Sequence, residues 1–384
     1  MRIFNAHVVT PERILPHGGV ECLNGRVMHV FERCDSGDVD LESCYLLPGL
    51  IDLHTHPPMA DGLDQARLAG LCHRLRGLGT AGFLFATGNI AVGEQVETLE
   101  ALRTNLDALG AGQGCLGIHL EGPYVAPEMR GGFLPEAITT PEDFPVEQLL
   151  DAAGPWAKYI NISPELPGAI DAIRACRRRG LAVSIGHSGA DRDALFAAQE
   201  AGAQTICHLF NTGAIMRFKE PGVLDVTLDL LGLASRSIVC EIICDGIHVD
   251  PMLVGLVYRA KGPDGIALIT DSLMGGASAN EGQVVESPMT QYTVVDGAAR
   301  NPEGGLCGST LTMAGAVARF AQFAPCSLVE AARAGAMTPA RLLGMDRDFG
   351  SIAAGRRALF CVLDQALEPR QHLARRLNEY DESE

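Results

Sequence analysis

The sequence predicts an α/β protein, a (β/α)8 TIM-like barrel with a small β-sandwich domain built from both chain ends. Eight short apolar segments alternate with amphipathic helical segments through the middle of the chain, and this alternation is typical of a parallel barrel. Both ends of the chain instead show strand patterns. The length of 384 residues accommodates one barrel of about 250 residues and a smaller domain.

The two ends of the chain supply the predicted small domain. Residues 20–31 form a predicted hairpin around Asn24-Gly25, because Asn-Gly is a strong two-residue turn signal. Near the other end, residues 358–363 form a short apolar strand. We therefore expect the first and last segments to meet in one β domain, with bounds at residues 1–47 plus 346–384.

The middle of the chain, residues 48–345, forms the predicted catalytic barrel. Between most of the expected strands lie segments rich in Ala, Leu and Arg with helical patterning, such as 169–179 and 191–201. The sequence contains eight apolar segments that we interpret as the barrel strands: 50–53, 83–86, 115–120, 159–162, 182–185, 204–207, 239–244 and 266–269.

Charge and composition exclude several classes of protein. The chain has 30 Lys and Arg against 47 Asp and Glu, a net charge of −17, so phosphate backbones and anionic lipids repel it. No segment approaches the ~20 apolar residues that span a bilayer, and the N-terminus does not resemble a signal peptide. The 12 cysteines are scattered without a CxxC pair, which favours reduced thiols. We expect a cytoplasmic protein that binds neither nucleic acid nor membranes.

Potential metal ligands follow six of the expected strands. A single histidine after a strand is more often a surface or hydrogen-bonded residue, and a glutamate before Gly-Pro can simply cap a turn. Because the carboxyl ends of all barrel strands surround one mouth, six such positions together instead indicate a metal site. The residues at these strand ends are His54 and His56, Glu121, His187, His208, His248 and Asp271.

This set of side chains suits metal-dependent hydrolysis. Residues i and i+2 of a strand point the same way, so His54 and His56 can face the barrel mouth together. Imidazole and carboxylate suit Zn²⁺ or Fe²⁺, and a bound cation lowers the pKa of water from about 15.7 toward ~7. Asp271 is placed to take a proton from that water and later to deliver it to a leaving amine.

Residues 48–56, PGLIDLHTH, resemble the opening motif of the amidohydrolase superfamily. Six further runs are similar to the branch of that superfamily that deacetylates amino-sugar phosphates, and the resemblance covers nearly the whole chain. It implies a hydrolase of linear amides that removes acetyl from an N-acetylated amino sugar, most simply N-acetylglucosamine 6-phosphate. It also implies a homodimer with shared active sites. The six runs lie at 119–123, 186–188, 208–211, 245–249, 270–271 and 308–312.

The resemblance also implies residue roles. The principal divalent metal would be held by Glu121, His187 and His208, and a second ion, where present, by His54 and His56. Asp271 matches the catalytic aspartate, which also contacts the metal. Substrate-binding positions are matched by Asn211 with Thr212, Lys219, His248, Leu306, Gly308 and Ser309, and by Phe133.

Two positions depart from the family pattern. Phe133 stands where relatives carry a histidine that contacts sugar and acyl group, and Lys219 stands where they carry a phosphate-binding arginine. Lysine binds phosphate as a point charge without the bidentate fork of arginine. The alternative is therefore a related amidohydrolase that acts on another N-acyl or cyclic amide without a phosphate requirement. A third hypothesis is a non-catalytic binding protein, but the full ligand set and Asp271 disfavour it.

Overall fold

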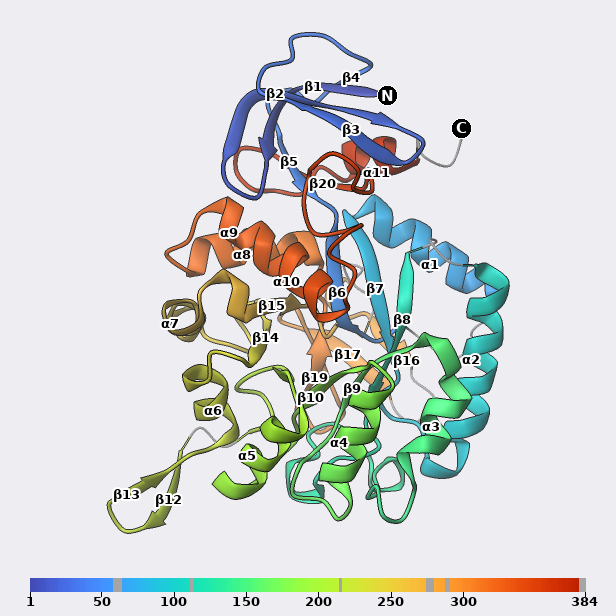
Figure 1. The fold of residues 1–384 in the computed structure, drawn as a ribbon, viewed down its shortest axis with the longest axis vertical. Helices are drawn as coiled ribbons and strands as arrows, with labels where there is room; N and C mark the ends of the chain where they lie inside the picture. The colour runs from blue at the N-terminus through green and yellow to red at the C-terminus, as the bar shows by residue number, and fades with distance from the viewer. Residues whose placement is uncertain (58–63, 111–113, 214–215, 274–279, 287–290, 380–384) are drawn as a thin grey trace.

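The computed structural model describes residues 1–57, 64–110, 114–213, 216–273, 280–286 and 291–379. The predicted fold class is confirmed: a parallel eight-stranded sheet curls into a barrel with helices around it, and a separate sheet made from the chain ends stands at one end (Figure 1). In sheet order the barrel strands are β15 (Ile266–Ile269), β14 (Val239–Ile243), β11 (Thr205–Ile206), β10 (Ala182–Ile185), β9 (Ala157–Asn161), β8 (Cys115–Glu121), β7 (Thr80–Ala86) and β6 (Leu50–Thr55).

The barrel strands are apolar runs because helices cover one face and the barrel interior covers the other. Every residue of β7 and of β15 is buried. The eight expected strands all occur, with ends that shift by a few residues. The largest shift is at β7, which begins at Thr80 and not at residue 83. Strand β11 keeps only Thr205–Ile206 in ladder pairing because the chain turns away after it toward His208.

Helices follow most barrel strands, and several of them begin at side-chain caps. Asp64 and Asp191 accept hydrogen bonds from the backbone N–H groups of Arg67 and Ala194, three residues on, and so satisfy groups that a helix start leaves unpaired. No helix in the described ranges is long and apolar enough to cross a membrane. The helices are α1 (Gln65–Gly77), α2 (Gln95–Leu109), α3 (Val146–Ala153), α4 (Ala169–Arg178), α5 (Arg192–Ala201), α6 (Leu228–Ala234), α7 (Pro251–Lys261), α8 (Met313–Phe323), α9 (Leu328–Ala332), α10 (Thr338–Leu342) and α11 (Gln371–Glu379).

The chain ends form one sheet of six strands with its own apolar core. Asn24 and Gly25 both have positive φ, 50° and 68°, as the expected two-residue hairpin turn requires. Helix α11 contributes Leu373 and Leu377 to the core of this sheet. The expected domain bounds stay a prediction. The strands are β1 (Arg2–Val9), β2 (Ile14–Leu23), β3 (Arg26–Phe31), β4 (Val39–Asp40), β5 (Tyr45–Pro48) and β20 (Phe360–Leu363).

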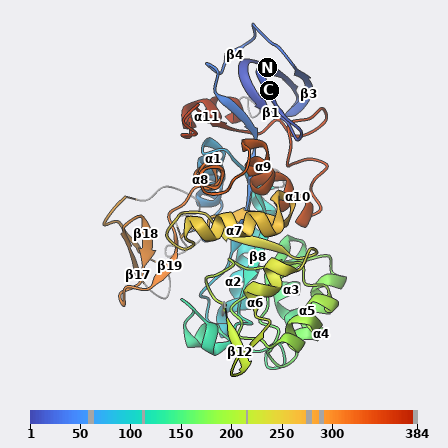
Figure 2. The same ribbon diagram turned by 90° about the vertical axis from the view of Figure 1, so that its left-hand side faces the viewer.

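Two small β elements interrupt the barrel pattern and were not predicted. A hairpin of β12 (Arg217–Glu220) and β13 (Val223–Asp225) projects from the body (Figure 1). A four-stranded antiparallel sheet leaves the barrel on one side between β15 and α8 (Figure 2). Its strands are too short to stand out in the sequence: β16 (Val284–Glu286), β17 (Gln291–Val295), β18 (Ala298–Arg300) and β19 (Leu306–Ser309).

The first and last barrel strands are joined at the mouth of the barrel. The backbone N–H of Asp271 donates to the carbonyl of His54 at 2.8 Å, and the N–H of His56 donates to the carbonyl of Ser272 at 2.8 Å. Deeper in the barrel, the buried Asp52 carboxylate accepts from the Thr270 hydroxyl at 2.5 Å and from the Thr270 N–H at 3.1 Å. These contacts place Asp271 beside the two histidines of β6.

Candidate metal centre

The six predicted metal-site residues all lie at the carboxyl ends of barrel strands. His54 lies in β6 and Glu121 ends β8, whereas the others lie one or two residues past the ends of their strands. Three of the latter have positive φ: His187 at 50°, His208 at 21° and Asp271 at 46°. Non-glycine residues adopt this region at a cost, and such strain gathers at functional sites. The turn after each strand thus aims these side chains into the barrel mouth.

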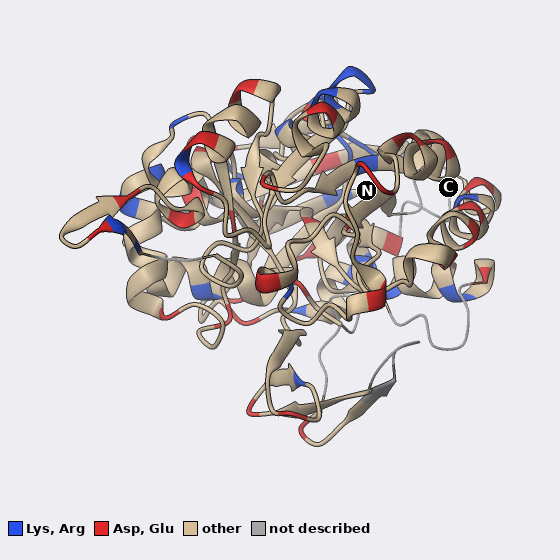
Figure 3. Cartoon of the chain, turned by 90° about the horizontal axis from the view of Figure 1, so that it is seen from below, with Lys and Arg blue, Asp and Glu red and all other residues tan. Residues whose placement is uncertain are grey.

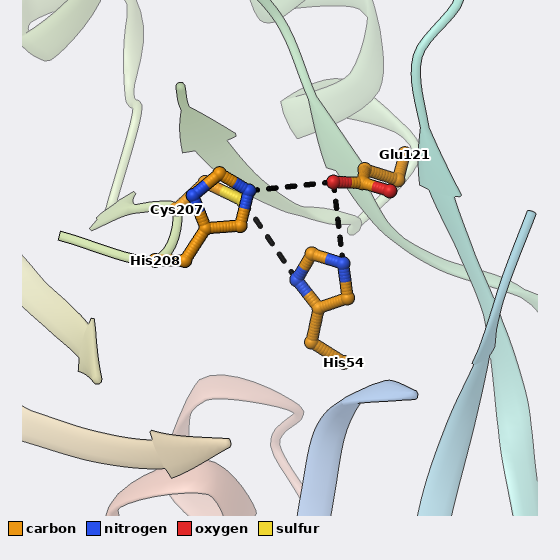
Figure 4. A group of neighbouring side chains, drawn as sticks. All are labelled: His54, Glu121, Cys207 and His208. Atoms are coloured by element: carbon orange, nitrogen blue, oxygen red, sulfur yellow. Dashed lines mark hydrogen bonds and ion pairs between the residues drawn. The ribbon is translucent and has the colours of Figure 1, made fainter. Parts of the chain in front are cut away.

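Glu121 is the centre of the cluster. Its Oε1 lies 3.3 Å from His54 Nε2 and 3.4 Å from the Nε2 atoms of both His187 and His208. Its Oε2 lies 3.3 Å from His56 Nε2. Figure 4 shows His54 and His208 both turned toward this carboxylate, each joined to it by a dashed line. One carboxylate is therefore shared by four imidazoles from the ends of three strands, β6, β10 and β11.

Asp271 completes a second group with the two histidines of β6. Its Oδ1 lies 3.2 Å from His56 Nε2 and 3.6 Å from His54 Nε2, and the two imidazole nitrogens lie 3.2 Å apart. Sequence reasoning missed one member of the cluster, the buried thiol of Cys207, whose Sγ lies 3.8 Å from His54 Nδ1. In the sequence, only the position of Cys207 directly before the expected ligand His208 could have indicated this thiol.

The donor set fits a divalent cation. Ligand atoms of His54, Glu121, Cys207 and His208 all lie within 4.8 Å of one another, as do those of His54, His56 and Asp271. Nitrogen, oxygen and sulfur donors at this spacing suit Zn²⁺ or a similar ion. Two histidines also have their other nitrogen fixed: His187 Nδ1 lies 3.0 Å from the Met129 carbonyl, and His208 Nδ1 lies 3.4 Å from the Thr212 hydroxyl. Metal-binding histidines usually have such partners.

The electrostatics favour ionised carboxylates. Burial alone would raise the pKa of Glu121, but the neighbouring imidazoles, first of all His54, hold it well below its ordinary value. Burial likewise opposes the charge of Asp271, yet His54 and His56 lower its pKa to about 2. Burial opposes protonation of His56 too, but Asp271 and Glu121 raise its pKa to about 9. The cluster therefore carries negative charge that protons or a cation must neutralise.

A pocket of about 330 Å³ opens over this cluster. Among the residues expected to bind substrate, Phe133, Asn211, Thr212, His248, Leu306 and Gly308 line it. Asn211 Oδ1 and His248 Nε2 have no hydrogen-bond partner in the described part of the chain. The other nitrogen of the His248 ring, Nδ1, lies 2.6 Å from an Asp245 carboxylate oxygen. These two free polar atoms are available to a bound substrate.

Ser309 and Lys219 lie outside the pocket lining. The Ser309 hydroxyl donates to the carbonyl of Thr270, and its N–H donates to the carbonyl of Asp271 at 2.7 Å, so Ser309 supports Asp271. Lys219 is exposed on the β12–β13 hairpin. Sequence reasoning also missed Asn89 and Glu94 in the lining, although both follow β7 closely. No sequence signal indicated Tyr292, which enters the pocket from β17.

Phe133 forms part of the pocket wall beside the metal cluster. It is buried in a small apolar cluster with Val125 and Ala137. Its ring meets the ring of His187 edge to face, with centroids 5.1 Å apart. The residue that departs from the family pattern therefore packs directly against a candidate metal ligand.

The family model described as the amidohydrolase family matches residues 45–382, and the chain belongs to this family. It is therefore a hydrolase of the class that cleaves amide bonds with a metal ion. It is 30% identical to N-acetylglucosamine-6-phosphate deacetylase of Bacillus subtilis, over 94% of this chain and 92% of that one. It is also 30% identical to N-acetylgalactosamine-6-phosphate deacetylase of Escherichia coli O157:H7, over 85% of each chain.

Two solved structures share this architecture at 27% sequence identity, and each match covers 96% of both chains. One is N-acetylglucosamine-6-phosphate deacetylase from Thermotoga maritima, with a TM-score of 0.82. The other is a mutant of the Mycobacterium smegmatis deacetylase in complex with N-acetyl-D-glucosamine-6-phosphate, with a TM-score of 0.83.

Glu121→Gln should strip most of the bound metal, because it replaces the shared charged ligand with a neutral amide. Metal content by mass spectrometry after dialysis measures this directly. Glu94→Gln, a change of a carboxylate that lines the same pocket outside the cluster, should keep wild-type metal content. Full metal content in Glu121→Gln would contradict the assignment of the site.

Metal binding should release protons at neutral pH. Below its pKa of about 9 His56 is protonated in the metal-free protein and must lose that proton to become a ligand. Apparent metal affinity should therefore rise from about pH 6 to about pH 8. Titration calorimetry in buffers of different ionisation enthalpy measures the release, and a binding enthalpy that is independent of the buffer would contradict this expectation.

Proposed function

We propose that this protein is a metal-dependent deacetylase that converts N-acetylglucosamine 6-phosphate and water to glucosamine 6-phosphate and acetate. The observation that carries the proposal is Asp271. This ionised carboxylate lies 3.2 Å from His56 in a metal-binding cluster at the floor of a sugar-sized pocket. The names of the aligned relatives support the substrate class.

Asp271 supplies the proton transfers of the reaction. When bound, a divalent cation polarises the acetyl carbonyl and acidifies water. The Asp271 carboxylate accepts a proton from the attacking water as the new C–O bond forms. It then returns that proton to the amide nitrogen as the C–N bond breaks, because an unprotonated amine anion is too poor a leaving group. His248 Nε2 and Asn211 Oδ1 are the free polar atoms that can orient the sugar.

The phosphate group needs a cation that the described lining of the pocket does not supply. Among the described residues that line the pocket there is no lysine or arginine, and the chain carries a net charge of −17. Figure 3 shows acidic positions interspersed with basic ones along the ribbon. A phosphorylated substrate therefore requires positive charge from elsewhere.

A second copy of the chain would supply that charge through the β12–β13 hairpin. The hairpin exposes Phe218 and Leu224, at 56% and 54%, and an isolated two-stranded hairpin is only marginally stable in water. Exposed apolar groups of this kind mark interfaces, so we propose a homodimer in which Lys219 reaches the partner's pocket. We assign this role to Lys219 in preference to the other candidate, Arg217, because the Arg217 guanidinium donates to the backbone carbonyls of Gly189 and Ala190 of its own chain.

A related amidohydrolase that acts on another N-acyl or cyclic amide without a phosphate requirement is the alternative function. It is favoured by Phe133 and by the absence of lysine and arginine among the described residues of the lining. We propose either Zn²⁺ or Fe²⁺ as the metal, with one or two ions bound. We further propose that the protein works in the cytoplasm, because all 12 cysteines are free thiols and most are buried, as suits a reducing compartment.

The substrate proposal is tested with a panel of N-acetylhexosamines, with and without the 6-phosphate. We expect the gluco 6-phosphate to be hydrolysed best, as judged by kcat/KM from acetate release, with the galacto 6-phosphate as the nearest competitor. Equal or higher kcat/KM for the unphosphorylated sugars would contradict the proposal and favour the alternative.

Asp271→Asn should bind substrate almost normally while kcat falls by at least about 10²-fold, because an amide cannot carry the proton. Asp264→Asn is the matched control: this carboxylate lies just before the start of the same strand and pairs with Arg341 at 2.8 Å. The control should retain wild-type turnover. Near-normal kcat in Asp271→Asn would end the proposed role of this residue.

Lys219→Ala should raise KM for the phosphorylated substrate by about 10-fold or more, since charged hydrogen bonds contribute about 1.5–3 kcal/mol. Lys158→Ala, on β9, is the control and should leave KM unchanged. Mixing Lys219→Ala with Asp271→Asn subunits should restore activity at low substrate, since one hybrid site has both residues. No recovery after demonstrated subunit exchange would show that Lys219 does not act across the interface.

A further inference from the structure

The barrel floor beneath the metal cluster contains a carboxylate that the proposed chemistry does not use. Glu241 lies on β14 and is 0% exposed. Its Oε2 has no hydrogen-bond partner in the described part of the chain. An unpaired buried carboxylate oxygen is costly, so the position of this atom calls for a partner at the site itself.

One oxygen of Glu241 is held by Tyr159, whose hydroxyl is in turn contacted by Thr205. The Tyr159 hydroxyl on β9 donates to Glu241 Oε1 and also contacts the Thr205 hydroxyl on β11. Burial, together with the neighbouring Glu241 carboxylate, raises the pKa of Tyr159 well above its ordinary value, so the phenol stays protonated and acts as the donor. The carboxylate is therefore fixed in one orientation.

The other oxygen faces His54. Glu241 Oε2 lies 3.6 Å from His54 Nδ1, whereas His54 Nε2 lies 3.3 Å from Glu121 on the opposite side of the ring. The ring of His119 packs edge to face on His54, with centroids 4.5 Å apart. A histidine that binds a cation through Nε2 must carry its proton on Nδ1, and a carboxylate at Nδ1 stabilises that tautomer.

His54 thus completes a pattern already present at the other ligands. His187 and His208 have Nδ1 partners in the Met129 carbonyl and the Thr212 hydroxyl. For His54 the candidates are Glu241 and Cys207, whose Sγ lies 3.8 Å away. A thiol is a weak acceptor, whereas the Glu241 oxygen is otherwise unpaired, so the carboxylate is the stronger partner.

We propose that Glu241 is the positioning residue for His54. It accepts the Nδ1 proton and leaves the Nε2 lone pair free for the cation, while Tyr159 and Thr205 hold the carboxylate in place. The inference deepens the proposed function and rests on the metal site that the function requires. It assigns a role in metal affinity to a residue that touches neither substrate nor metal.

The test compares metal affinity in wild-type protein, Glu241→Gln, Tyr159→Phe and a control. Metal-free proteins are titrated with Zn²⁺ against a competing chelator. Glu241→Gln should bind about 10–100-fold more weakly, because an amide that accepts from Tyr159 turns its NH₂ toward Nδ1 and favours the wrong tautomer. Tyr159→Phe should weaken binding in the same direction but less. Ser184→Ala removes a buried hydroxyl on the barrel strand β10 that has no hydrogen-bond partner among the described residues, and this variant should keep wild-type affinity.

A second readout separates positioning from a general structural role. With excess Zn²⁺, Glu241→Gln should recover most of its kcat with an unchanged KM for substrate, whereas a damaged fold would not recover. Should Glu241→Gln fail to fold, Tyr159→Phe carries the same comparison.

Wild-type affinity for Zn²⁺ in Glu241→Gln would overturn the inference but leave the proposed function standing. The same holds for Tyr159→Phe if Glu241→Gln does not fold. A loss of affinity in Cys207→Ser that matches or exceeds the loss in Glu241→Gln would also overturn it. Wild-type protein that binds no divalent metal would overturn the proposed function together with this inference.

Discussion

The closure of the barrel between β6 and β15 is the constraint on which the site depends. Two backbone hydrogen bonds of 2.8 Å join His54 to Asp271 and His56 to Ser272, and Asp52 pairs with Thr270 below them. These contacts bring the proposed proton carrier against residues that lie more than two hundred positions earlier in the chain. Without these hydrogen bonds between β6 and the end of β15, the two histidines of β6 would face no aspartate, and the second candidate metal group would not exist.

The charge balance of the cluster follows from this geometry. Glu121 and Asp271 are both placed where water cannot solvate them well, and burying two carboxylates without compensation would cost several kcal/mol. Four imidazoles provide compensation only when they are protonated, whereas a divalent cation provides it with neutral histidines. The same burial that makes the site costly in the metal-free protein therefore makes it selective for a cation. The fixed orientation of the His187 and His208 rings, through Met129 and Thr212, reduces the entropy that binding must remove.

Substrate choice depends on parts of the chain outside the barrel strands. Phe133 places an apolar ring next to His187, Tyr292 enters from the small sheet that follows β15, and the cation for a phosphate would come from a hairpin on a second copy. The barrel thus fixes the chemistry, while loops and inserted strands decide which amide enters. This division is typical of barrel enzymes, in which catalytic groups sit on strand ends and specificity on loops.

The sequence by itself determined the barrel, the sheet at the chain ends and the positions of the candidate ligands. These follow from local patterns: apolar runs predict strands, and the residue after each strand must lie at the mouth. The roles of Glu121, His187 and Asp271 remain predictions that the geometry supports. Only the tertiary structure decided that Cys207 lies beside His54, that Ser309 supports Asp271 and that Lys219 lies outside the lining of its own pocket. The Glu241 contact with Tyr159 joins residues 82 positions apart, and no periodicity along the chain encodes such a pair, because it forms only when the sheet closes.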